Sequence, residues 1–179
     1  MSDLASQDNV DYDALMALAI KEAERAAESE DIPIGCVIIH QNRIIGRAHN
    51  QIELLKDATA HAEMIAITQA ESAIGDWRLN ECTLIVTKEP CPMCAGAILL
   101  SRIGMVIYGV PAPRDGAAGS AINILNNPAL GSSVKCIGGV LEEECRWLLQ
   151  EFFQRVRKKP KRGEEIRAKG FESSDKSIE

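Results

Sequence analysis

The spacing of apolar residues predicts a helix near each end of the chain. From Tyr12 to about Ser29, apolar residues recur with the period of a single helix face. A second stripe runs from Leu141 to Lys159, where acidic residues open the segment and basic residues close it, as the helix dipole favours. Both segments are therefore predicted to be amphipathic helices that cover a core.

Two interior segments also predict helices. The first runs from about Ala60 to Ala73, with Thr59 as its expected N-cap and Glu63 in its first turn, where negative charge is favoured. The second runs from Cys91 to Ser101 and is opened by Pro90.

Short apolar runs rich in β-branched residues predict about five strands between these helices. They read IPIGCVIIH, RIIGRAHN, CTLIVT, MVIYGV and VKCIGGV, and the first two are joined by the turn-like QN, as in a hairpin. The stretches QIELLKDA and PAPRDGAAGS are expected to be loops. Helices that alternate with apolar strands predict an α/β fold, a three-layer α/β/α sandwich around a mixed five-stranded sheet.

Length and composition indicate one globular domain. A chain of 179 residues can bury a substantial core but is too short for two domains of ordinary size. We expect residues 1–159 to form this domain. Residues 160–179 are polar and poor in aromatic residues, and we expect them to be a mobile tail.

Charge and targeting features favour a cytoplasmic protein. Apolar runs fall short of the roughly 20 residues of a membrane span, and the N-terminus lacks the pattern of a signal peptide. In the cytoplasm thiols stay reduced, so the six cysteines favour metal binding or core packing over disulfides. The net charge of −6 argues against a surface that is basic throughout, although Arg155 to Arg162 forms a local basic segment.

Four residues in two short motifs carry the candidate chemistry. His61 lies two residues before Glu63, and Cys91 lies three residues before Cys94, with both motifs at predicted helix starts. On a helix the two cysteines share one face, and a helix N-terminus lowers thiol pKa values toward the thiolate that binds zinc. His61, Cys91 and Cys94 are therefore predicted to bind one zinc ion.

A closed structural zinc site needs four protein ligands, and this set has three. The other cysteines and histidines have no paired spacing with this set; they are Cys36, Cys82, Cys136, Cys145, His40 and His49. Most of these cysteines fall in apolar patterns that are typical of core residues. The open position is expected to hold water, as in catalytic zinc sites. Glu63 is then free to act as general acid and base rather than as a ligand.

These motifs resemble those of the zinc-dependent cytidine and deoxycytidylate deaminase superfamily, which carries H-x-E and P-C-x-x-C. The order and spacing of DATAHAEM, TLIVTKEPCPMCAGAILLSRIG, YG, GAAGS and LLQEFF further resemble the bacterial tRNA adenosine deaminases, over roughly Tyr12 to Arg157. The resemblance implies a cytidine-deaminase-like fold, a homodimer, and hydrolysis of adenosine to inosine at the wobble position of a tRNA anticodon. It also implies substrate contacts for Asn50, Ala62 and Pro90.

Two loops depart from that family pattern. The tRNA enzymes commonly carry polar and charged residues after the fourth strand, where this chain has Val110-Pro111-Ala112-Pro113. The loop after Asn50 is also less basic, with Gln51, Leu55 and Lys56. The departures leave the catalytic residues unchanged and affect the surfaces expected to meet RNA.

Three functions are compatible with the sequence. The first is deamination of adenosine in tRNA. The second is zinc-dependent deamination of a free base or nucleoside such as guanine or cytosine, which the acidic net charge favours. The third is a non-catalytic zinc scaffold, which would require a fourth protein ligand and no role for Glu63.

Overall fold

Five strands form one mixed sheet in the order β2-β1-β3-β4-β5. The structure, a computed structural model, describes residues 11–158 of the chain; the predicted tail and the second half of the basic segment lie outside them. The strands are β1 Gly35–His40, β2 Arg43–His49, β3 Cys82–Lys88, β4 Met105–Val110 and β5 Lys135–Gly138. β1 is antiparallel to β2 and β3, whereas β3, β4 and β5 run parallel, which confirms the predicted mixed sheet.

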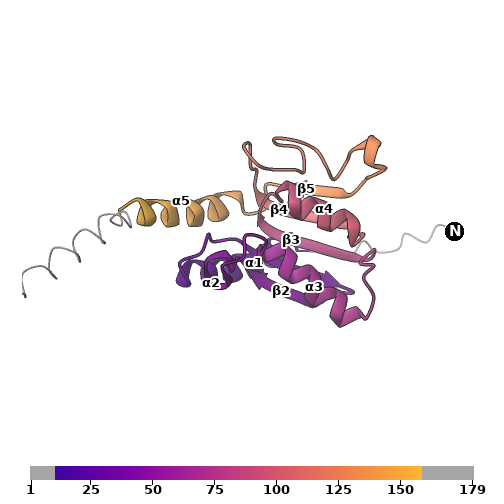
Figure 1. The fold of residues 1–179 in the computed structure, drawn as a ribbon, viewed down its shortest axis with the longest axis horizontal. Coiled ribbons are helices and arrows are strands. Elements are labelled where there is room, and N and C mark those ends of the chain that lie inside the picture. Colours follow the sequence, from indigo (N-terminus) through magenta and orange to yellow (C-terminus); the bar gives the residue numbers. More distant parts are fainter. Residues whose placement is uncertain (1–10, 159–179) are drawn as a thin grey trace, which may run out of the picture.

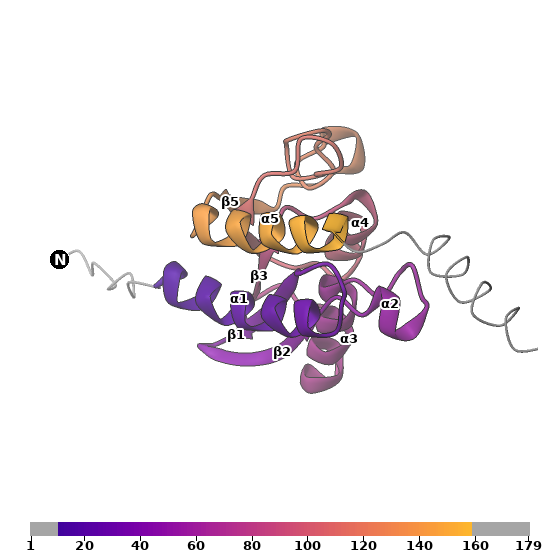
Figure 2. The same cartoon turned by 90° about the vertical axis from the view of Figure 1, so that its left-hand side faces the viewer.

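Helices cover both faces of the sheet (Figure 1). They are α1 Tyr12–Glu28, α2 Ile52–Leu55, α3 Ala62–Ile74, α4 Pro92–Leu100 and α5 Glu142–Lys158, with a short 3-10 helix at Pro128–Leu130. α1 and α5 lie side by side on one face, and α3 and α4 lie behind the sheet in that view (Figure 2). The result is the predicted three-layer α/β/α sandwich.

Small residues let the helices lie directly against the sheet. α1 buries Ala19 and Ala23 on its inner face, and a Cβ atom on Gly35 would come within 2.0 Å of the Ala19 carbonyl oxygen. α3 buries Ala66 and approaches β2 in the same way, because a Cβ on Gly46 would lie 2.5 Å from the Ala66 oxygen. The layers can pack this tightly only where glycine and alanine meet.

The boundaries of two segments differ from the sequence predictions. The prediction that Thr59 caps α3 is wrong: its hydroxyl and its backbone N–H both donate to the Asp57 carboxylate, and His61 occupies the N-cap position. The expected loop after Asn50 contains the short helix α2, which ends at Lys56 in the left-handed conformation. Neither feature produces a periodic pattern of apolar residues in the sequence, because each depends on turn contacts over a few residues.

Within the part of the chain that is described, none of the helices combines the length and the apolarity that crossing a membrane requires.

Candidate metal centre

The two predicted motifs meet where α3 and α4 begin. His61 is the N-cap residue of α3 and Cys91 is the N-cap residue of α4. Both have extended backbone conformations and lie just before the first helical turn. Cys94 lies in the first turn of α4, and Pro92 follows Cys91 at the position where a helix tolerates proline. Two helix N-termini therefore point the three side chains toward one another.

The distances between these atoms fit one tetrahedral zinc ion. The Nδ1 atom of His61 lies 3.5 Å from the Cys94 sulfur and 3.7 Å from the Cys91 sulfur. With Zn–N of about 2.0–2.1 Å and Zn–S of about 2.3 Å, a tetrahedral site separates nitrogen from sulfur by about 3.5 Å. Among the residues that the structure describes, these three form the one group of histidine, cysteine and acidic residues placed to hold a metal ion.

Electrostatics also favour a cation at this point. A hydrogen bond from Cys94, together with one from His61, lowers the pKa of Cys91 to about 4. The hydrogen bond to Cys91 and burial raise the pKa of Cys94 far above its usual range. Two adjacent thiolates repel each other, so both can ionise together only if a positive ion lies between them. The donor set thus fits zinc, which binds thiolate and imidazole.

Glu63 lies beside the group. Its side chain is 3% exposed, and its Oε2 atom has no hydrogen-bond partner within the described chain. Burial raises the pKa of Glu63 above its usual range. A buried carboxyl oxygen without a partner is costly, so the Oε2 atom of Glu63 is available to a bound group or substrate.

The three predicted substrate-contact residues surround this centre. Asn50 follows β2 and is 1% exposed, and its Oδ1 atom accepts a 2.9 Å hydrogen bond from the backbone N–H of Ala62. Ala62, the first residue of α3, is fully buried, and its N–H is occupied by this contact. Pro90 is buried immediately before Cys91. The structure therefore brings all three next to the metal-ligand residues.

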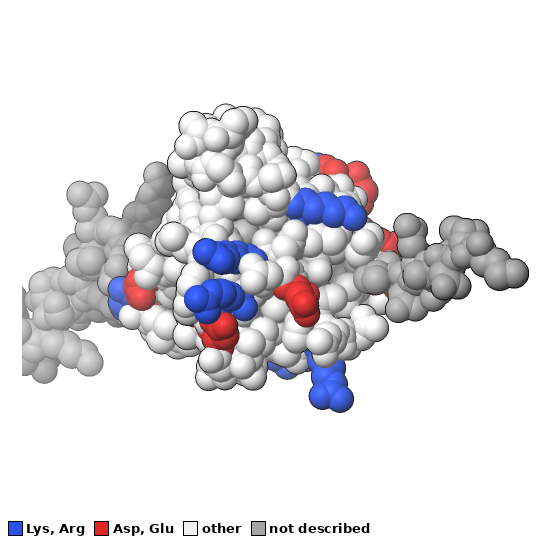
Figure 3. Space-filling view, turned by 90° about the vertical axis from the view of Figure 1, so that its right-hand side faces the viewer, with Lys and Arg blue, Asp and Glu red and all other residues white. Residues whose placement is uncertain are grey.

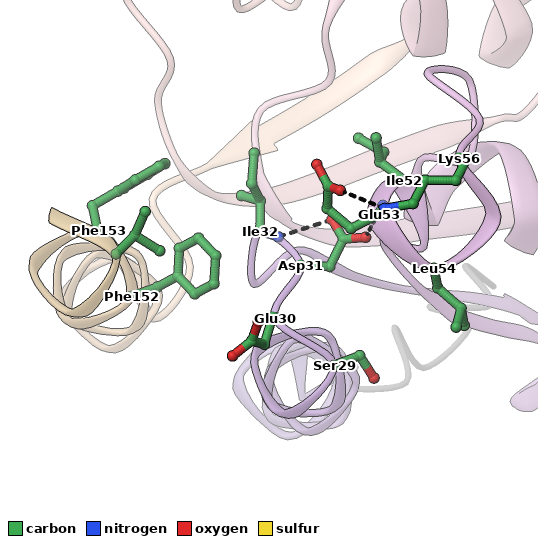
Figure 4. A pocket seen from close by; sticks show the side chains of 11 residues that line it. Ser29, Glu30, Asp31, Ile32, Ile52, Glu53, Leu54, Lys56, Phe152 and Phe153 are labelled. Carbon is green, nitrogen blue, oxygen red and sulfur yellow. Dashed lines mark hydrogen bonds and ion pairs between the residues drawn. The ribbon is translucent and has the colours of Figure 1, made fainter. Parts of the chain in front are cut away.

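Sequence patterns missed two buried carboxylates, Asp31 and Glu89, which hold the neighbouring loops. Asp31 accepts hydrogen bonds from the backbone N–H groups of Glu53 at 2.7 Å and Ile32 at 2.9 Å, and so fixes the start of α2 (Figure 4). Glu89 accepts three backbone hydrogen bonds from the segment after β4. Their partners lie more than twenty residues away in most cases, so no local motif indicates them.

A cavity of about 690 Å³ lies between α2 and α5. Figure 4 shows Phe152 and Phe153 of α5 on one side and the Asp31–Ile32 segment between them and α2. Phe153 is 44% exposed, and the Arg155 guanidinium lies 5.7 Å from the centre of the Phe152 ring. Aromatic and basic groups therefore meet acidic ones at this edge of the molecule, because Glu30, Asp31 and Glu53 also line the cavity.

Comparisons with known proteins agree with this geometry. Residues 10–110 match the family described as the cytidine and deoxycytidylate deaminase zinc-binding region. The tRNA-specific adenosine deaminase of Bacillus subtilis is 47% identical over 146 residues, which cover 82% of this chain and 91% of that protein.

Solved structures share the same fold. One, from a study of A-to-I editing by tRNA:A34 deaminases at the wobble position of transfer RNA, has a TM-score of 0.73 and 38% identity, covering 76% of this chain and 99% of the other. A guanine deaminase from Nitrosomonas europaea has a TM-score of 0.68 at 18% identity, covering 78% of this chain and 83% of that chain. At this low identity the likeness supports a shared fold and not a shared substrate.

Proposed function

Because this chain belongs to the cytidine and deoxycytidylate deaminase family, we propose that it hydrolyses adenosine to inosine at the wobble position of a tRNA anticodon. The observation that carries this function is the likeness to the Bacillus subtilis tRNA-specific adenosine deaminase, which extends far beyond the metal motif along most of both chains. The overall reaction consumes adenosine and water and releases inosine and ammonia.

We assign the metal ligands as His61 through Nδ1 and Cys91 and Cys94 through their sulfur atoms. A bound zinc ion supplies Lewis acidity that makes water a nucleophile near neutral pH. With three protein ligands, a bound zinc ion would keep one position for water, which suits a catalytic site, whereas a structural site would need a fourth protein ligand.

Glu63 transfers the protons between water, the purine ring and the departing amine. Its carboxylate accepts a proton from the attacking water and delivers it to the ring nitrogen next to the reacting carbon. The water oxygen bonds to that carbon, and the second proton, from the resulting hydroxyl group, passes through the same Glu63 oxygens to the amine. The C–N bond then breaks, the carbonyl of inosine forms and ammonia leaves. Burial supports this role, because the raised pKa of Glu63 brings the protonated form closer to neutral pH.

Asn50, Ala62 and Pro90 orient the base. The link from Asn50 Oδ1 to the Ala62 N–H holds the Asn50 side chain, which leaves its amide Nδ2 as the donor for the purine. Ala62 and Pro90, which are buried next to His61 and Cys91 in the chain, provide apolar surface beside the metal ligands. A fixed donor beside apolar surface suits a base that has been flipped out of its stack.

The end of α5 supplies the RNA-contact surface. Arg155, Arg157 and Lys158 lie in its last turn, which follows Phe152 and Phe153 and includes the cavity-lining Val156. Aromatic rings stack unpaired bases and cations contact phosphates, so this edge suits nucleotides that flank the target adenosine. Because Val110–Pro113, directly after β4, carries no charge, α5 takes a larger share of the phosphate contact.

The protein acts as a homodimer in the cytoplasm. Residues 116–134 contain no charged side chain, and they form the white lobe at the top of Figure 3. Leu100, which ends α4, is 78% exposed, and Leu130 in the lobe is 59% exposed. An exposed apolar, uncharged surface suits contact with a second copy, and the mass of the protein in solution tests this.

Free guanine or cytosine is the second candidate substrate. The net charge of −6 and the uncharged Val110–Pro113 segment favour a small neutral substrate over RNA. Incubation of the purified protein with a tRNA pool, followed by sequencing, separates the two. Inosine at position 34 of specific tRNAs supports the first function. An unmodified pool, together with release of ammonia from guanine or cytosine, supports the second.

A further inference from the structure

Glu89 follows β3 directly and precedes Pro90 and Cys91, and its carboxylate accepts hydrogen bonds from a loop after β4. Its side chain is buried, with 2% exposed. The Oε2 atom accepts a hydrogen bond of 2.8 Å from the Ala112 N–H, and the Oε1 atom accepts bonds of 2.9 Å and 3.0 Å from the N–H groups of Ala118 and Ser120. One carboxylate therefore ties down both ends of the segment Pro111–Ser120, which we call the rim loop.

The rim loop is shaped around this carboxylate. A Cβ atom on Gly116 would lie 2.4 Å from both the Cδ and the Oε2 atoms of Glu89, so only glycine leaves room for the side chain. Lys88, the preceding residue, forms a 2.6 Å ion pair with Asp115 in the same loop. Lys88 and Glu89, at the C-terminal end of β3, thus both hold the rim loop.

The rim loop also borders the metal centre. The Ala117 N–H donates to the Pro90 carbonyl oxygen at 2.8 Å, directly before the ligand Cys91. Ala117 and Ala118 pack in the cluster that contains Ala62 and Ala95, the neighbours of His61 and Cys94. A displacement of the rim loop would therefore move a wall of the substrate site without removing a metal ligand.

We propose that Glu89 is a positioning residue that holds the rim loop in the conformation needed to bind substrate. Three backbone N–H groups of the rim loop share its two oxygens, so the contacts of this carboxylate are with the loop backbone and favour a structural role over proton transfer. The role in substrate binding rests on the proposed tRNA function, whereas the role in loop order does not.

Glu89→Gln and Gly116→Ala test the two sides of this contact. The glutamine keeps the length of the side chain, but its NH₂ group cannot accept a hydrogen bond, so at least one rim-loop N–H loses its acceptor. The alanine leaves the carboxylate in place and fills its space. Glu81→Gln is the matched control, because Glu81 stands at the opposite end of β3 and its side chain is 77% exposed.

Amide hydrogen exchange and steady-state kinetics are measured on the zinc-loaded proteins. Both test variants should keep their zinc and exchange the amides of Ala112, Ala118 and Ser120 at least about 10-fold faster, since the opening of a buried contact controls exchange. The KM for tRNA should rise by about 10-fold with kcat within about 3-fold, because binding is impaired and chemistry is not. The Glu81→Gln protein should match the wild type in both measurements.

Unchanged exchange in the rim loop, or loss of zinc with exchange accelerated throughout the molecule, would overturn the proposal. A fall in kcat at constant KM would also overturn it, since Glu89 would then act on the chemical step. If the wild-type protein does not convert tRNA, the proposed function fails, and the exchange rates alone decide whether Glu89 holds the loop.

Discussion

The Nδ1 atom of His61 and the sulfur of Cys94 lie 3.5 Å apart, although thirty-three positions separate the two residues in the chain. The distance arises because α3 and α4 pack on the same face of the sheet and begin at the same edge. Each helix contributes its N-terminus, where exposed N–H groups favour negative ligands such as thiolates. The metal site is thus a consequence of how two helices start.

Replacement of Cys94 by alanine should remove zinc. Two thiolates dominate the affinity of a one-histidine, two-cysteine site, and loss of one leaves too few ligands. We expect about one zinc ion per wild-type chain and far less in the Cys94→Ala protein, measured by elemental analysis. Cys82→Ala is the control, because Cys82 is buried in β3 and should leave the zinc content unchanged. Full zinc occupancy in Cys94→Ala would refute the ligand assignment.

Glu63→Gln should separate proton transfer from metal binding. We expect the variant to retain zinc and to lose about 10²- to 10⁴-fold in kcat, since a general acid and base contributes that much and Glu63 acts in several transfers. Glu71→Gln on the same helix should retain full activity. If Glu63→Gln instead lost its zinc, Glu63 would be a ligand and the proton-transfer role would be wrong.

The cysteines should differ in their reaction with iodoacetamide once a chelator has removed zinc. The pKa of Cys91 is lowered to about 4, so its thiol is ionised across the range from pH 5 to 8 and should react throughout it. Burial raises the pKa of Cys145 to about 12, and this thiol should stay unmodified. Mass spectrometry of labelled peptides measures both. Zinc should protect Cys91, and labelling of Cys91 that begins only above pH 8 would contradict the assigned electrostatics.

The basic segment should control the salt dependence of RNA binding. Replacement of Lys158, Lys159, Lys161 and Arg162 by glutamine should weaken binding and reduce the log–log salt slope by about 0.7 for each lost phosphate contact. Titration of an anticodon stem-loop at several salt concentrations measures this. Lys21→Gln, on the exposed side of α1, serves as the control. An unchanged slope would mean that other residues, such as Lys56 and Arg114, contact the phosphates.

The sequence predicted which candidate metal ligands come together better than it predicted the surrounding loops. His61, Cys91 and Cys94 were identifiable because ligand spacing within each motif is local, and the alternation of helices and strands predicted the sheet that brings the motifs together. The start of α3 was misplaced, because Thr59 is engaged by Asp57 in a turn that leaves no periodic pattern.

Asp31 and Glu89 could not be predicted from the sequence for a different reason. Each is an acidic residue beside an apolar segment, and its role depends on backbone groups that folding brings from elsewhere. Glu53 N–H reaches Asp31 across 22 positions, and Ser120 N–H reaches Glu89 across 31. Contacts of this kind depend on the three-dimensional structure and on no particular residue type at the partner position.

A side-by-side assay of defined substrates tests the central claim most directly. The zinc-loaded protein is incubated with a tRNA that carries adenosine at the wobble position, its anticodon stem-loop, free adenosine, guanine and cytosine, and inosine and ammonia are quantified. We predict turnover of the tRNA, with weaker turnover of the stem-loop and essentially none of the free compounds, because the flanking nucleotides supply the binding energy. Turnover of guanine or cytosine with neither RNA converted would contradict the account.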